Sequence, residues 1–119
     1  MAEVRRQGFT TLKLGDYDPK ATLRVLVGRP VGDAAGGTRA FFFLKETFLG
    51  NDASAPSSKL TVAKKGKVTV TLSYGVYNPG DTAGAPSGRK RVRFRLEGER
   101  IHALDTIPLD SARFQRRTS

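Results

Sequence analysis

Residues 67–77, KVTVTLSYGVY, alternate apolar and polar side chains along their whole length. Successive side chains of a strand point to opposite faces of its sheet, so this period of two predicts a strand with one buried and one solvated face. The alternation returns in residues 89–96, RKRVRFRL, and a third apolar run, IHALDTI, occupies 101–107. Gly98 lies between the last two runs, where a tight reversal needs a positive φ. The three runs predict an antiparallel meander that the remaining segments must cover.

Shorter apolar runs on the N-terminal side predict further strands. Residues 40–44, AFFFL, are too few for a buried helix and are typical of a strand covered on both faces, followed by a turn and a returning strand. Residues 21–27, ATLRVLV, fit a helix that opens at Asp18 and Pro19, or a strand with alternating β-branched residues, and we favour the strand. Two more short strands are expected at 9–14 and 59–63.

These runs predict a mainly β fold: a single small antiparallel sandwich or partly closed barrel of seven or eight strands. At most one short helix is expected, near 19–28. A chain of 119 residues forms one domain, and we expect its ordered core to span about 8–109. Pro108 ends the last strand, so the basic stretch 110–119 is predicted to be a disordered tail.

The composition excludes several classes of site. The chain has no cysteine and one histidine, His102, which excludes thiolate catalysis, disulfides, iron–sulfur clusters and any site with two imidazoles. No apolar run approaches the roughly 20 residues of a membrane-spanning helix. The net charge of +10 suggests anionic partners, and the alternative, to which we give more weight, is a solvated basic surface without a specific partner.

Catalytic and metal-binding motifs are missing from the sequence. The glycine-rich stretch 28–37 has neither the GxGxxG nor the GxxxxGK[ST] spacing of phosphate-binding loops. Ser73, Ser87 and Ser111 lie outside any GxSxG pattern, and Asp16 and Asp18 belong to no twelve-residue calcium loop. We therefore predict a protein that is not an enzyme, with no catalytic residues, no metal site and no cofactor.

A cationic strand face is the clearest candidate for a binding site. Arg91, Arg93 and Arg95 project from one face of the predicted strand at intervals of about 6.8 Å, where they could meet phosphate or carboxylate groups. The alternative role of these arginines is to protect the sheet against strand-to-strand aggregation. The loop 78–88 is long for a hairpin, and such loops often carry binding functions, so the candidate ligand-binding residues also include Tyr77, Asp81 and Ser87.

Several short motifs occur in a defined order along the chain: AFFFLKETFLGNDASAPS, VTVTLSYGVYNPGD, PSG and VRFRLEGERIHALDTIP. Over about residues 8–109, this order resembles the LppP/LprE family of actinobacterial lipoproteins. The matching positions are Phe41, Phe42, Phe43, Gly50, Asp52, Pro56, Ser57, Tyr74, Tyr77, Pro79, Asp81, Pro86, Ser87, Gly88, Leu104, Asp105, Ile107 and Pro108. Many relatives carry cysteine before the PSG, where this chain has Gly84 and Ala85, so no thiol role is transferred.

The resemblance implies an exported domain of the cell envelope, or a secreted one, if an export segment has been removed; otherwise the chain would be cytoplasmic. It implies no catalytic residues. Together with the charge, it leads us to expect a non-enzymatic binding domain whose partner is an anionic envelope polymer, a lipid surface or a protein. The alternatives are a basic nucleic-acid-binding protein, which the scattered positions of the basic residues disfavour, and an assembly domain that pairs through a sheet edge.

Overall fold

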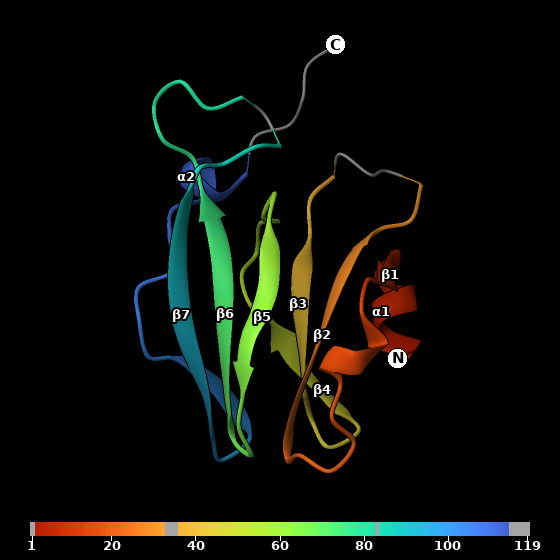
Figure 1. Ribbon diagram of the computed structural model, residues 1–119. Helices are drawn as coiled ribbons and strands as arrows, with labels where there is room; N and C mark the ends of the chain where they lie inside the picture. Colours follow the sequence, from red (N-terminus) through yellow and green to blue (C-terminus); the bar gives the residue numbers. More distant parts are fainter. Residues whose placement is uncertain (1, 33–35, 83, 115–119) are drawn as a thin grey trace.

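The structure, a computed structural model, describes residues 2–32, 36–82 and 84–114. They form two antiparallel sheets of four strands each, in the orders β1–β2–β3–β4 and β5–β6–β7–β8 (Figure 1). The strands are β1 Phe9–Thr11, β2 Leu23–Pro30, β3 Arg39–Leu44, β4 Thr47–Asn51, β5 Leu60–Lys65, β6 Thr69–Val76, β7 Gly88–Glu97 and β8 Arg100–Ala103. The mainly β prediction is confirmed, and the described strands form a two-sheet sandwich and not a closed barrel.

The predicted meander forms three of the four strands of the second sheet, β6 to β8. Val70 of β6 pairs with Phe94 of β7, and Leu72 pairs with Val92; all four side chains are buried. The turn between β7 and β8 contains Gly98 at φ 63°, as the sequence predicts. The period of two therefore assigns the buried face of the two longest strands of this sheet correctly.

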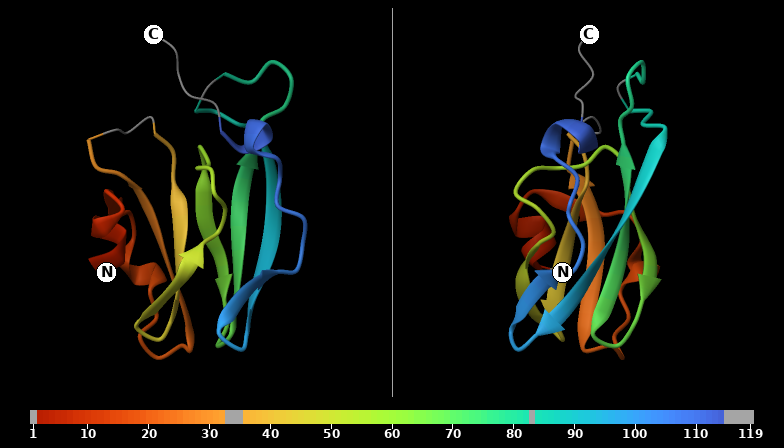
Figure 2. Two further views of the ribbon diagram at one scale, coloured as in Figure 1. Left: turned by 180° about the vertical axis from the view of Figure 1, so that it is seen from behind. Right: turned by 90° about the vertical axis from the view of Figure 1, so that its left-hand side faces the viewer.

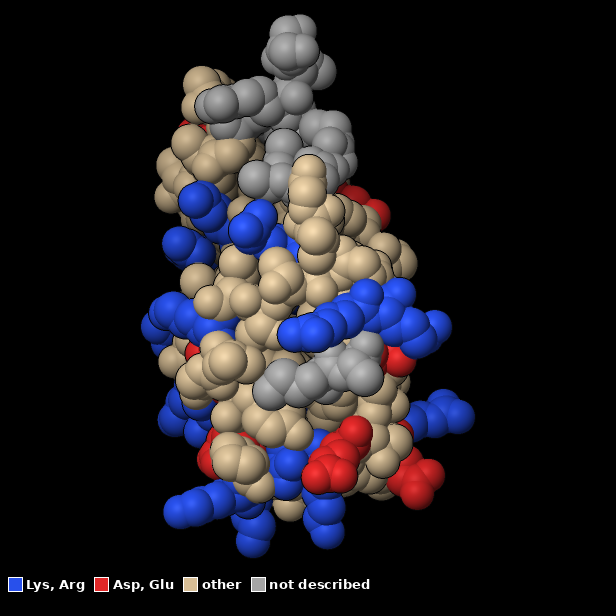
Figure 3. Space-filling model, turned by 90° about the vertical axis from the view of Figure 1, so that its right-hand side faces the viewer, with Lys and Arg blue, Asp and Glu red and all other residues tan. Residues whose placement is uncertain are grey.

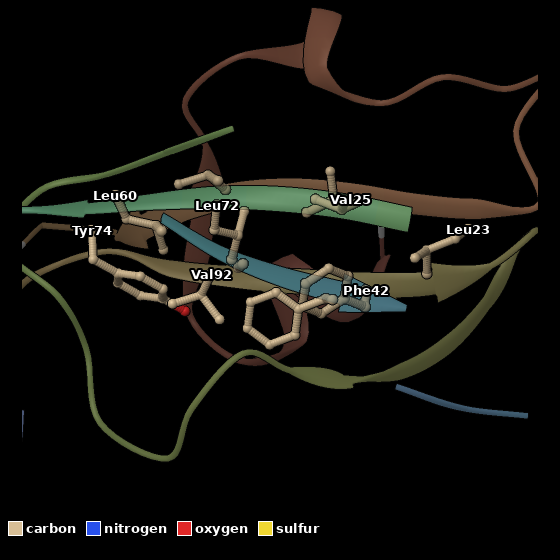
Figure 4. Packing of buried hydrophobic residues seen from close by; sticks show 11 residues of the cluster. Leu23, Val25, Phe42, Leu60, Leu72, Tyr74 and Val92 are labelled. Carbon is tan, nitrogen blue, oxygen red and sulfur yellow. The ribbon is translucent and has the colours of Figure 1, made fainter. Parts of the chain in front are cut away.

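Strands β2 and β3 form the centre of the first sheet, which confirms the strand over residues 21–27. Phe42 points into the sandwich, and its ring centroid lies 5.0 Å from that of Phe94 in the other sheet. Figure 4 shows side chains of both sheets meeting in this core, among them Val25, Leu72 and Val92.

A second apolar cluster covers the opposite face of β3. Phe41 and Phe43 point away from the sandwich interior and pack with Leu26 and Val4, with Phe9, Tyr17 and Phe48 around them. β3 is therefore buried on both faces, which explains its uninterrupted apolar run.

The two α-helices lie at the ends of the described chain, and none lies at 19–28, where the sequence allowed at most one short helix. α1 spans Ala2–Arg6 and α2 spans Asp110–Arg113, and a 3₁₀ turn, η1, spans Leu14–Asp16. Val4 of α1 is 1% exposed because it packs on β3, so the ordered chain begins before residue 8.

The prediction of a disordered tail from residue 110 is wrong for residues 110–114. Arg113 is 1% exposed, and its guanidinium is surrounded by carbonyl and hydroxyl oxygens that compensate for its burial. Residues 115–119 lie outside the described part of the chain.

Figure 2 shows α2 at one end of the sandwich, beside the connection between β6 and β7, and the β3–β4, β5–β6 and β7–β8 turns at the other end.

Candidate functional site: a cationic sheet face and a buried polar cluster

The outer face of the second sheet carries the three arginines predicted from the sequence. The strand register places Arg91 opposite Ser73, Arg93 opposite Thr71 and Arg95 opposite Thr69. All three arginines are exposed, because β7 buries its other face in the core. The structure therefore brings Arg91, Arg93 and Arg95 together on one solvated face.

Only Arg93 of these three is neutralised by an acidic residue in the described part of the chain. Its backbone N–H and its Nε–H both donate to Oδ2 of Asp105, and its Nη2 donates to Oδ1, each at 2.9 Å. The side-chain hydrogen bonds from Arg93 hold the pKa of Asp105 well below its usual range. The bidentate pair is therefore ionised at neutral pH and fixes the segment after β8 against β7.

Three cations remain for an external partner: Arg91 and Arg95 of β7 and Lys64 of β5. Lys64 pairs with Thr71 after an irregularity in β5 and is exposed. No ion pair with an acidic side chain forms at Lys64, Arg91 or Arg95 among residues 2–32, 36–82 and 84–114. We call Lys64, Arg91 and Arg95 the basic face. His102 pairs with Arg95 across the strands, and its Nε2 lies 3.8 Å from Oε1 of Glu97.

The predicted binding residues Asp81 and Ser87 form hydrogen bonds within the 78–88 loop itself. Oδ2 of Asp81 accepts hydrogen bonds from the backbone N–H groups of Asn78 and Ser87, each at 2.8 Å, and from Oγ of Ser87 at 3.0 Å. The backbone N–H donors lower the pKa of Asp81. Asn78 Nδ2 donates to Oγ of Ser87 at 2.8 Å and so closes the base of the loop.

Tyr77 also has an internal partner on each side. Its hydroxyl donates to Oγ of Ser58 at 2.8 Å and accepts from the backbone N–H of Gly84 at 2.6 Å. Tyr77, Asp81 and Ser87 therefore hold the loop in shape, and in the described chain no hydrogen bond joins them to the three arginines. The six predicted site residues form two separate groups.

A cluster of buried polar groups at the α2 end of the sandwich was missed by sequence reasoning. Tyr74 is fully buried, and its hydroxyl donates to Oδ2 of Asp52 at 2.6 Å. Oδ1 of Asp52 accepts from the backbone N–H of Ala40 at 2.9 Å. Burial raises the pKa of Asp52 above its ordinary value, and burial next to the Asp52 carboxyl raises the pKa of Tyr74.

Arg113 completes this cluster from α2. Its guanidinium donates to the backbone oxygens of Pro108, Ala55 and Pro56 and to Oγ of Ser57, and it pairs with Asp110 of its own helix. Its Cζ lies 5.8 Å from the centre of the Tyr74 ring. Three cluster members, Asp52, Ser57 and Tyr74, are positions at which the chain resembles the LppP/LprE motifs. That shared membership was the one sequence signal that could have indicated the cluster. Arg113 lies beyond those motifs.

An open groove of about 670 Å³ lies beside the cluster. Its lining is Asp52, Ala53, Ser54, Ile107, Pro108, Leu109, Asp110, Ser111 and Arg113. The only cation in this lining is Arg113, which is already paired, so the groove has a different charge character from the basic face. In the described residues no group of three or more acidic or histidine side chains could hold a metal ion, and no helix is long and apolar enough to cross a membrane.

The positive charge is not confined to one side of the molecule. Figure 3 shows the side that carries α1, where basic side chains are interspersed with acidic ones. The basic face on the second sheet differs because the strand register places each of its cations opposite a serine or threonine of β6.

These features define a small two-sheet β-sandwich domain with one exposed cationic sheet and a polar cluster that closes one end. A family model for LppP/LprE lipoproteins matches residues 15–99, and the chain belongs to this family. Membership of a lipoprotein family indicates association with the cell envelope. No curated protein and no solved structure matches the chain.

Proposed function

We propose that this chain is a non-enzymatic binding domain of the cell envelope that retains an anionic polymer on its basic face. The observation that carries the proposal is the register between β5, β6 and β7, which aligns Lys64, Arg91 and Arg95 on one solvated face. In the described chain these cations have no acidic partner. Membership of the lipoprotein family supports an envelope partner.

The spacing of the arginines suits a repeated polymer charge. Arg91 and Arg95 are four residues apart on one strand, a separation of about 13 Å at roughly 3.3 Å per residue. The hydroxyls of Thr69, Thr71 and Ser73 lie opposite the arginines and can hydrogen-bond to polymer oxygens between the charges. Exposed charges attract weakly one by one and are screened over about 8–10 Å at physiological salt, so a polymer that contacts several of them is favoured over a single anion.

The test compares retention on immobilised poly-L-glutamate for the parent and for Arg91→Gln/Arg95→Gln, over a range of salt concentrations. The matched control is Lys13→Gln/Lys20→Gln, which removes the same charge from exposed positions near the other sheet. We expect the arginine variant to elute at lower salt than the control, because the control loses only net charge. Arg93 is left unchanged so that its pair with Asp105 keeps the fold intact.

Equal elution of the two variants would show that only net charge matters and would refute the basic face as the site. A parallel column of immobilised double-stranded DNA separates the proposal from nucleic-acid binding. Retention on DNA with a much steeper salt dependence than on polyglutamate would favour the nucleic-acid alternative, because each neutralised phosphate releases counterions.

A further inference from the structure

Arg113 occupies a pocket whose shape and chemistry match a guanidinium group. Its Nε donates to the carbonyl oxygen of Pro108 at 2.8 Å, and its Nη1 donates to Oγ of Ser57 at 2.7 Å and to the carbonyl oxygen of Ala55 at 3.1 Å. Its Nη2 pairs with a carboxylate oxygen of Asp110. All three nitrogens of the planar group are thus satisfied by oxygens of the protein.

The surroundings of the pocket favour a cation of this shape over an ammonium. The Tyr74 ring lies 5.8 Å from Cζ, and the buried Asp52 carboxyl accepts the Tyr74 hydroxyl beside it. A lysine has three donors on one tetrahedral nitrogen, which cannot reach acceptors placed around a fork of three nitrogens. Arginine is almost never fully buried unless it is paired. Arg113 is only 1% exposed, and its pairing within the pocket is what permits this burial.

We propose that this end of the sandwich is a guanidinium-binding site, which the chain fills with its own Arg113. The acceptors from Ala55, Ser57 and Pro108 belong to segments outside α2, so most of the site remains when the Arg113 side chain is removed. The open groove beside it is lined by Arg113 itself together with Pro108, Asp110 and Ser111, so it provides an entry path to the site. The ligand class is therefore an alkylguanidinium, such as the side chain of an arginine.

Occupancy of the site is connected to the 78–88 loop. The carbonyl oxygen of Arg113 accepts from the N–H of Ser58, and that of Ala112 accepts from the N–H of Tyr77, each at 2.8 Å. The hydroxyl of Tyr77 donates a hydrogen bond to Oγ of Ser58 and accepts one from the backbone N–H of Gly84 in the loop. Loss of the guanidinium should therefore loosen α2 and change the environment of Gly84.

The test is chemical rescue of Arg113→Ala in the full chain. Ethylguanidinium replaces the atoms that this substitution removes, and ethylammonium carries the same charge without the planar fork. We expect ethylguanidinium to raise the Tm of the variant saturably, by about 5 °C at ten times its Kd, and to return the Gly84 amide NMR signal toward its parent position. Ethylammonium should do neither, and the parent protein should not respond to either compound.

The matched control is Arg24→Ala. Arg24 also donates to backbone carbonyls, of Ala21 and Pro19, and lies over the Tyr17 ring, but it is only half-buried and has no carboxylate partner in the described chain. An equal rise in Tm for both variants, or no rise for Arg113→Ala, would overturn the proposal. If Arg113→Ala is unfolded alone, the compounds are present during refolding: recovery of the folded signal with ethylguanidinium alone supports the site, and no selective recovery refutes it.

Discussion

Replacing Tyr74 with phenylalanine tests the buried cluster by removing one oxygen atom. The substitution keeps the ring in the core and removes the hydroxyl that donates to Oδ2 of Asp52 at 2.6 Å. Asp52 is 8% exposed, so water cannot readily replace the lost donor. The carboxylate would still accept from the backbone N–H of Ala40.

The expected cost follows from the charge and the burial of the acceptor. A hydrogen bond to a charged group contributes about 1.5–3 kcal/mol, a large share of the 5–15 kcal/mol typical of a whole domain. At about 4 °C per kcal/mol for a chain of this size, the Tm should fall by roughly 6–12 °C.

The cost should also depend on pH. Burial raises the pKa of Asp52 in the folded state above its ordinary value, so this carboxyl favours folding most at low pH, and that contribution is lost as pH rises through the raised pKa. Losing the Tyr74 donor removes stabilisation of the ionised form and raises this pKa further. The difference in unfolding free energy between parent and variant should therefore be largest near neutral pH and shrink as the solution is acidified.

The assay is urea unfolding followed by far-UV circular dichroism at several pH values, with Tyr77→Phe as the control. Tyr77→Phe removes hydrogen bonds to neutral groups only: the half-buried bond to the hydroxyl of Ser58 and an exposed bond from the N–H of Gly84. A hydrogen bond between neutral groups contributes about 0.5–1.5 kcal/mol, and water can replace the exposed donor. A Tyr74→Phe cost below that of Tyr77→Phe, or one that stays constant with pH, would refute an ionised Asp52 held by Tyr74.

Two further predictions concern the core and the surface pair. Phe94→Ala should reduce the unfolding free energy by about 3–5 kcal/mol, because the ring is 2% exposed and contacts the opposite sheet; a melting curve that matches the parent would contradict its place in the core. Asp105→Asn should lower the Tm at neutral pH, because the pKa of Asp105 is depressed by Arg93 and the stability linked to it is present above the ordinary pKa and lost as pH falls. The difference in Tm should disappear in strong acid, and a difference that persists there would show that the ion pair is not its source.

The strands and the buried face of the second sheet could be predicted because they depend on local alternation. The burial of Phe94 follows from the alternation of residues 89–96 once one face of the strand is taken to be buried. The arginine face follows from the same alternation. The partner of Arg93 does not, because the position of Asp105 beside β7 depends on the path of the chain after β8.

The α2 end could not be predicted for a different reason. A four-residue helix has too few residues to show a period, and an arginine in a basic stretch is ordinarily solvated. Arg113 is buried because its acceptors include Ser57, which is 56 residues earlier in the chain. Sequence alone does not indicate this proximity, because it depends on how distant segments pack. The hydrogen bonds from Asn78 and Ser87 to Asp81 are local, but they depend on the conformation that the 78–88 loop adopts, and no motif in the sequence specifies it.

The strand order of the sandwich has a consequence for how the chain folds. Each sheet contains four consecutive strands, so the pairings within a sheet are between neighbours in sequence, and the chain passes between the sheets through the segment from β4 to β5. Pairings between neighbouring strands close short loops and form quickly, whereas the contact between Phe42 and Phe94 joins residues far apart in sequence. We expect each half to assemble its hairpins early and the docking of the two halves to limit the folding rate. Until that step, the inner faces of both sheets would be open to solvent and prone to self-association.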